Sequence, residues 1–197
     1  MERRKPFLQN VKLGGPTTIF DIKVMLCYLL NSLKKPISAE VLLNIIQSEQ
    51  LVNYFEYESA MGELLDAGHI EKFTDETGED FYKISENGAA LVVDLESSLS
   101  MTLRTRVVRA ALKVISYRQN AQENNVTVTA SENGGYFLSL EVPGMPEPLC
   151  KLQLYFPERL QAEMARDGFL DNPALVYSAI LTALTGDTST LISLLSE

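Results

Sequence analysis

Residues 64–88 read LLDAGHIEKFTDETGEDFYKISENG, and this stretch decides how the first half of the chain folds. Its leucine-rich start followed by Gly68 is typical of a helix that ends at a left-handed glycine. Residues 69–73 and 80–84 are strand-like and lie on either side of the turn-rich residues 74–79, so they predict a β-hairpin. Ser85 then predicts the N-cap of another helix. The stretch therefore predicts the order helix, hairpin, helix.

The residues before this stretch predict two more helices. Apolar residues recur at three-to-four spacing over residues 19–33, and Pro36 prevents this helix from continuing. Ser38 is the expected N-cap of a second helix, and a third helix is predicted over about residues 55–67. We expect its aromatic residues Tyr54, Phe55 and Tyr57 to pack in the core and at the start of the helix. Three helices followed by a hairpin are the arrangement of a winged helix, in which the third helix is displayed on the surface and the hairpin forms the wing.

The residues after the hairpin predict a connecting helix and a smaller module. A helix from residue 85 continues to about residue 119, with a break at Ser97 and Ser98. We next expect three strands and then a helix over residues 158–166, with Pro157 at its N-terminal position N1. Two further helices are expected after it. The predicted fold class is α+β: an N-terminal winged helix, a long connecting helix, and a small antiparallel sheet with C-terminal helices. The expected divisions are residues 16–96, 97–123 and 124–197.

The composition is typical of a folded protein that neither spans a membrane nor carries a signal peptide. The 197 residues are 46% hydrophobic, which supports a folded core. No segment reaches the roughly 20 apolar residues that span a bilayer, and the basic start is not followed by the apolar segment of a signal peptide. Cys27 and Cys150 lie in apolar runs and are expected to be buried free thiols in a reducing compartment. We therefore expect a cytoplasmic protein without membrane contact.

The excess negative charge is local. The net charge is −9, and residues 49–80 carry ten acidic residues against the single base Lys72, so this segment alone accounts for all of it. At 100° per residue, the outward side of the predicted third helix is acidic, and so is the wing. The predicted acidic interaction face consists of Glu56, Glu63, Asp66, Glu76 and Glu79.

Residues 64–71 and 78–88 resemble winged-helix regulators of the PadR and MarR kind, which share the leucine-rich helix end, the hairpin and the Ser-Glu-x-Gly step into the next helix. The whole chain also resembles a family from Gram-positive anaerobes described only as winged-helix proteins of unknown function. The resemblance implies a homodimer that binds operator DNA, with the third helix in the major groove. This sequence departs from the pattern because its reading helix offers carboxylates where arginine, lysine or amide side chains are expected.

Basic residues gather elsewhere. Residues 97–122 contain no acid, and the helix expected there carries a basic stripe. The N-terminal arm is also basic. These residues are candidates for contact with a DNA backbone, or with the acidic face of a second subunit: Arg3, Arg4, Lys5, Arg104, Arg106, Arg109 and Lys113.

No catalytic, metal or cofactor site is predicted. His69 is the only histidine and has neither a second ligand nor a nucleophile at a recognisable spacing. The wing acids lack the ligand order of a calcium loop. Two non-enzymatic functions remain open. The first is a homodimeric transcriptional regulator that contacts DNA partly through its basic residues, although the charge of the reading helix disfavours DNA. The second is a protein-interaction module whose acidic face docks a basic partner.

Overall fold

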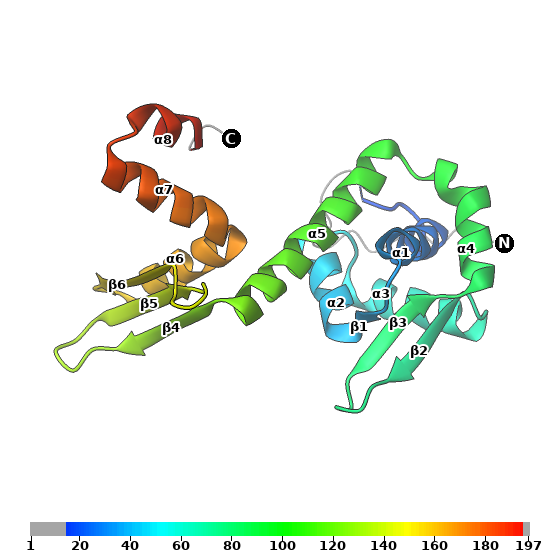
Figure 1. The fold of residues 1–197 in the computed structure, drawn as a ribbon. Coiled ribbons are helices and arrows are strands. Elements are labelled where there is room, and N and C mark those ends of the chain that lie inside the picture. The colour runs from blue at the N-terminus through cyan, green and yellow to red at the C-terminus, as the bar shows by residue number, and fades with distance from the viewer. Residues whose placement is uncertain (1–14, 195–197) are drawn as a thin grey trace. The chain divides into compact units, whose positions relative to one another are not determined.

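The computed structural model describes residues 15–194, and every structural statement below concerns this range (Figure 1). The fold is mixed α+β, as predicted, with eight α-helices and two three-stranded antiparallel sheets. The chain divides into two compact units, and the division falls between Val114 and Ile115, inside the long helix α5. We call the described residues up to 114 unit 1 and those from 115 onward unit 2.

Unit 1 contains the predicted helices and hairpin together with one short strand. Its elements are α1 (Ile19–Leu33), β1 (Ile37–Ser38), α2 (Ala39–Ser48), α3 (Tyr54–Asp66), β2 (Ile70–Thr74), β3 (Asp80–Ile84), α4 (Glu86–Leu95), the 3-10 turn η1 (Glu96–Ser98) and the first part of α5 (Met101–Glu123).

Local capping explains where the first helices begin. The Thr18 hydroxyl accepts a hydrogen bond from the Asp21 backbone N–H at 3.0 Å and caps α1. Ser38 caps α2 in the same way, as predicted. Ser38 also lies in β1, which pairs with β3 and gives the sheet the order β1-β3-β2. The two-residue strand β1 was not predicted because its only signature is this distant pairing.

Within residues 64–88, hydrogen bonds to backbone groups hold the end of α3, the start of β2 and the start of α4 together. Gly68 has φ +67° and ends α3, and the next backbone N–H, of His69, donates to the Leu64 carbonyl at 3.0 Å. The Ser85 hydroxyl donates to the carbonyls of Gly68 and His69, at 2.7 and 2.9 Å. A Cβ on Gly88 would lie 2.0 Å from the His69 carbonyl oxygen, so only glycine lets α4 start this close to β2.

The core of unit 1 is built around α1, which contacts α3, α4 and β3. Met25, Leu26 and Leu29 of α1 are fully buried, as are Leu42 and Ile45 of α2. The free thiol of Cys27 lies in the same core, where burial raises its pKa to about 12. The prediction for the second cysteine was wrong. Cys150 is only half-buried because it begins an edge strand of the second sheet.

Unit 2 is a sheet followed by three helices. Its elements after the end of α5 are β4 (Asn125–Ala130), β5 (Tyr136–Val142), β6 (Cys150–Phe156), α6 (Arg159–Asp171), α7 (Pro173–Thr185) and α8 (Thr188–Leu194). The strands form an antiparallel meander in the order β4-β5-β6.

The predicted bounds of α6 were wrong at both ends. Pro157 is not its first residue, because Glu158 is still extended and the helix begins at Arg159. The helix continues to Asp171 since Phe169 and Leu170 pack on the sheet with Leu138 and Leu140.

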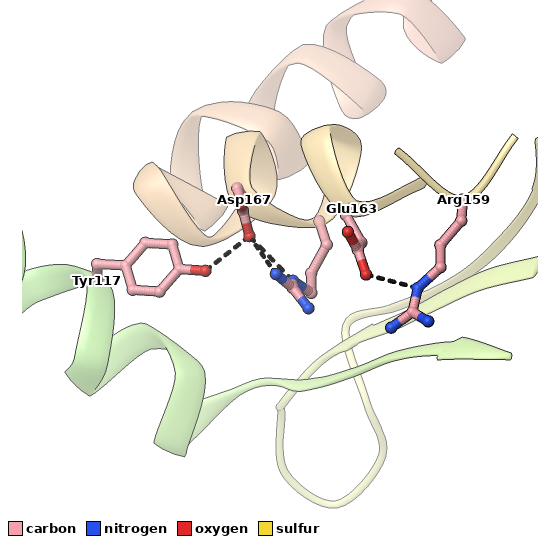
Figure 2. A network of polar contacts seen from close by, with 5 residues as sticks. Tyr117, Arg159, Glu163 and Asp167 are labelled. Carbon is pink, nitrogen blue, oxygen red and sulfur yellow. Dashed lines mark hydrogen bonds and ion pairs between the residues drawn. The ribbon is translucent and has the colours of Figure 1, made fainter. Parts of the chain in front are cut away.

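Side chains at the end of α5 anchor α6 (Figure 2). Asp167 accepts hydrogen bonds from the Tyr117 hydroxyl at 2.8 Å and from Nε and Nη2 of Arg166 at 2.9 and 2.8 Å. The Asn120 amide donates to the Leu170 carbonyl at 2.8 Å. Burial acts to raise the pKa of Asp167, but the hydrogen bonds from Tyr117 and Arg166 outweigh it and hold this pKa below its usual value. We interpret this cluster as a structural clamp.

Candidate functional site: an acidic face on unit 1

Helix α3 has one buried and one exposed side, in the phase the sequence predicted. Tyr57, Ala60, Met61 and Leu64 are buried against the rest of unit 1. The opposite side presents acidic residues to solvent. We call the carboxylates on this side of α3, together with those of the hairpin turn, the acidic face: Glu58, Glu63, Asp66, Glu76 and Glu79.

Nearby lysines neutralise only part of the local charge. Lys23 of α1 forms an ion pair with Glu63 at 2.8 Å. On the hairpin, Lys72 pairs with Asp80 at 2.6 Å and Lys83 with Glu71 at 2.8 Å. Within residues 15–194, no ion pair engages Glu58, Asp66 or Glu76, which are exposed. The acidic face therefore keeps a net negative charge after its neighbours are counted.

The turn of the hairpin is held in one conformation. The carboxylate of Asp75 accepts hydrogen bonds from the Thr77 hydroxyl at 2.6 Å, from the Thr77 backbone N–H at 2.9 Å and from the Glu79 backbone N–H at 3.0 Å. The Thr77 hydroxyl and these backbone groups hold the pKa of Asp75 below its usual value. These hydrogen bonds define the conformation of the turn and favour the charged form of Asp75. The side chain of Glu76, at the tip of the turn, is exposed to solvent.

Glu56, which was predicted on the acidic face, takes part in starting α3. Its backbone N–H donates to Asn53 Oδ1 at 3.0 Å, and its carboxylate accepts from Asn53 Nδ2 at 2.7 Å. This reciprocal pair is a capping arrangement, and Glu56 is half-buried in it.

Two aromatic side chains lie exposed at the start of the same helix. Phe55 is 83% exposed and Tyr54 is 49% exposed, and their rings meet edge to face with centroids 5.9 Å apart. The predicted core packing is wrong for these two residues, which pack on each other at the start of α3 instead, whereas Tyr57 is buried as predicted. At 100° per residue, Phe55 falls opposite the buried side of α3. Helical phase could have placed it, whereas residue type alone could not.

Comparison with known proteins places the whole arrangement in one family. The family described as "Domain of unknown function (DUF4364)" matches residues 22–184. This chain belongs to the DUF4364 family. No curated protein and no solved structure matches it. The matched region of this DUF4364 protein runs from α1 to α7 and contains the acidic face.

The predicted basic stripe of the DUF4364 protein is partly used inside unit 1. Arg106 Nη2 donates to the Glu49 carbonyl, and its Nε lies 3.3 Å from the Glu49 carboxylate. Glu49 is the C-cap of α2, so Arg106 stabilises the end of that helix. Arg104 lies 3.8 Å from Glu96. Distant partners of this kind leave no trace in local sequence.

Two predicted basic residues are exposed. Arg109 and Lys113 are solvent-accessible on α5. Arg109 also lines a surface hollow of about 620 Å³, with Thr105 one turn and Thr102 two turns earlier on the same helix. The predicted contacts Arg3, Arg4 and Lys5 lie outside the described residues.

The described part of the DUF4364 protein contains no cluster of metal ligands and no helix that could cross a membrane. Across residues 15–194, no three His, Cys, Asp or Glu side chains gather as a metal site. His69 lies at the junction of α3 and β2, where its carbonyl accepts from Ser85. No helix in this range has the length and apolarity to cross a membrane.

Proposed function

We propose that this DUF4364 protein is a non-catalytic regulatory protein whose unit 1 is a winged helix that docks a basic protein surface through its acidic face. The observation that carries the proposal is the exposed ring of Phe55 on the same helix as the carboxylates of Glu58 and Asp66, which form no ion pair with any residue from 15 to 194. This combination suits recognition of a cationic protein surface.

The winged-helix part of the proposal rests on the order of elements and on the resemblance to PadR and MarR regulators. Unit 1 has three helices, then the hairpin β2–β3, then α4. Helix α3 presents a whole side to solvent, as the reading helix of such a domain does.

The charge of that side argues against conventional docking on DNA. A duplex carries one negative charge per roughly 1.7 Å of its axis, and binding proteins neutralise phosphates with lysine and arginine. The outward residues of α3 include Glu58, Glu63 and Asp66, and the adjacent hairpin turn adds Glu76. The lysine nearest this side, Lys23, is already paired with Glu63. A phosphate backbone would meet uncompensated carboxylates.

The same features favour a protein partner. Interfaces derive most of their affinity from a few aromatic or arginine anchors, and charged surroundings set orientation and association rate. Phe55 and Tyr54 provide an aromatic anchor, and Glu58 and Asp66 provide a negative surround that would attract lysine and arginine side chains.

A second candidate function is DNA contact through α5. Arg109 and Lys113 are exposed one turn apart, and the hydroxyls of Thr102 and Thr105 extend the same stripe. A homodimeric transcriptional regulator could use this stripe against phosphates, away from α3. The free thiols of Cys27 and Cys150 support the cytoplasm as the compartment for either function.

The docking proposal predicts a charge-specific loss of binding. The probes are an oligo-lysine peptide and a peptide of alternating lysine and leucine, titrated against the full chain. Glu58→Lys with Asp66→Lys should weaken both by roughly 10-fold, since two attractive charges become repulsive. Phe55→Ala should weaken the lysine–leucine peptide selectively.

The matched control reverses two exposed acids of unit 2, Glu132→Lys with Glu147→Lys, which changes the net charge by the same amount. Binding by this control should stay near that of the wild type. Equal losses in both double variants would show that only net charge matters and would refute a defined acidic face.

A further inference from the structure

Helix α7 is an apolar helix that unit 2 leaves only partly covered. It runs from Pro173 to Thr185 with the sequence PALVYSAILTALT, yet none of its residues is buried. It contacts α6 and α8, and Val176 packs at the margin of the sheet core. Figure 1 shows α7 and α8 as a hairpin leading away from the sheet of unit 2.

One side of α7 has the spacing of a packing stripe. Tyr177, Ile180, Leu181 and Leu184 recur at i, i+3, i+4 and i+7 and therefore lie along one side of the helix. Tyr177 and Ile180 are half-buried, whereas Leu181 is 42% and Leu184 79% exposed, and Ile192 of α8 is 67% exposed. Helices with such a stripe normally bury it against another element.

We propose that the α7–α8 hairpin is the self-association surface of this protein, on which the stripe of one chain packs against the same stripe of a second copy about a two-fold axis. The two hairpins would then form a four-helix layer. This assignment concerns unit 2 and does not depend on the function proposed for the acidic face.

Charge selects a second copy over other occupants. Asp187 is the only charged residue between positions 172 and 194, and no lysine or arginine follows Arg166. The hairpin thus has no cations for an anionic membrane and no alternating charges for a charged protein partner. A neutral apolar stripe is complementary to itself, and homodimer interfaces are the more apolar class of interface.

The available area is that of a small dimer interface, below the standard size. With a rise of about 1.5 Å per residue, α7 is roughly 20 Å long, and two helices side by side are roughly 20 Å wide. Because α8 is about half as long as α7, the hairpin offers roughly 300 Å² in projection, before side-chain relief is counted. A standard interface buries about 800 Å² of accessible surface per partner.

The test is sedimentation velocity of the full chain from low to high micromolar concentration. The wild type should sediment as a dimer of the 21.9 kDa chain. Leu181→Asp with Leu184→Asp should weaken the dimer by roughly 100-fold or more, because two carboxylates would have to be buried. Leu181→Met with Leu184→Met keeps the stripe apolar and should remain dimeric.

The control is Val93→Asp on α4, an equally exposed apolar residue of unit 1 at 76% exposure. It should remain dimeric. Far-UV circular dichroism of the Leu→Asp variant should match the wild type, since Leu184 contributes little to the folded monomer. A monomeric wild type, an undiminished dimer in the Leu→Asp variant, or dissociation of the Val93→Asp control would each overturn the proposal.

Discussion

Helices α1 and α7 are both rich in apolar residues, but the two units treat them in opposite ways. Helix α1 buries seven residues at the centre of unit 1, whereas α7 buries none in unit 2. Unit 1 thus buries its most apolar helix and presents negative charge around α3, although single apolar side chains such as Phe55 and Val93 are exposed. Unit 2 has a small core around Leu138 and Phe169 and leaves apolar side chains on its helices exposed.

This contrast assigns different proposed tasks to the two units. A unit with a complete core folds without help, so its outward charges are available to select a partner. A unit with a partly exposed apolar helix gains stability when another surface covers that helix. We therefore propose that unit 1 recognises and unit 2 assembles.

The largest expected effect on the free energy of unfolding comes from replacing a leucine by alanine in each unit. Leu42 of α2 is fully buried, and Leu42→Ala should lower the free energy of unfolding by about 2–5 kcal/mol at every protein concentration. Leu184→Ala should matter only at concentrations where the wild type is dimeric, because its partner atoms belong to a second copy. Urea unfolding at two concentrations separates these cases. A concentration-independent loss for Leu184→Ala would contradict the contrast between the units.

A smaller effect is expected within α5. Arg106→Ala removes the hydrogen bonds to Glu49 at the end of α2 and should lower the free energy of unfolding by about 1–3 kcal/mol. The exposed neighbour Arg109 serves as the control, since Arg109→Ala should change stability by less than about 0.5 kcal/mol. Urea unfolding measures both. Equal effects would mean that Arg106 contributes no more than a surface cation.

The smallest expected effect concerns the loss of thermal stability at acidic pH. The pKa values of Asp75 in the hairpin turn and Asp167 in the clamp are held below the usual value. Carboxylates of this kind stabilise the fold above the ordinary Asp pKa of about 3.9, and the contribution is lost as the pH falls through the lower folded value. The melting temperature of Asp75→Asn and of Asp167→Asn should therefore depend less on pH between 5 and 3, by about 1–3 °C. An unchanged pH dependence would show that these contacts do not persist in solution.

Local signals allowed much of the fold to be predicted from sequence. Ser38, Gly68 and Ser85 marked helix ends because caps and left-handed glycines act within a few residues. Features that depend on distant partners were missed. Strand β1 exists through its pairing with β3, and α6 continues to Asp171 because the sheet covers Phe169 and Leu170.

The candidate site likewise combines features that local sequence predicts with features that depend on distant residues. The negative charge of residues 49–80 could be counted directly, and the buried phase of α3 followed from its periodicity. The engagement of Arg106 by Glu49, 57 residues away, could not be inferred. The position of Phe55 on the helix predicts its exposure. The prediction followed the general preference of aromatic residues for protein cores instead.

The most direct test of the acidic face is fluorescence anisotropy of the full chain with a random-sequence duplex, titrated at about 50 mM and 200 mM salt. We predict no measurable binding by the wild type at either salt concentration. We also predict a gain of salt-dependent binding in Glu58→Lys with Asp66→Lys, because the reversed charges would let the exposed side of α3 meet phosphates. Tight wild-type binding with a steep loss at higher salt, abolished by Arg109→Glu with Lys113→Glu, would contradict the proposal and establish DNA contact through α5.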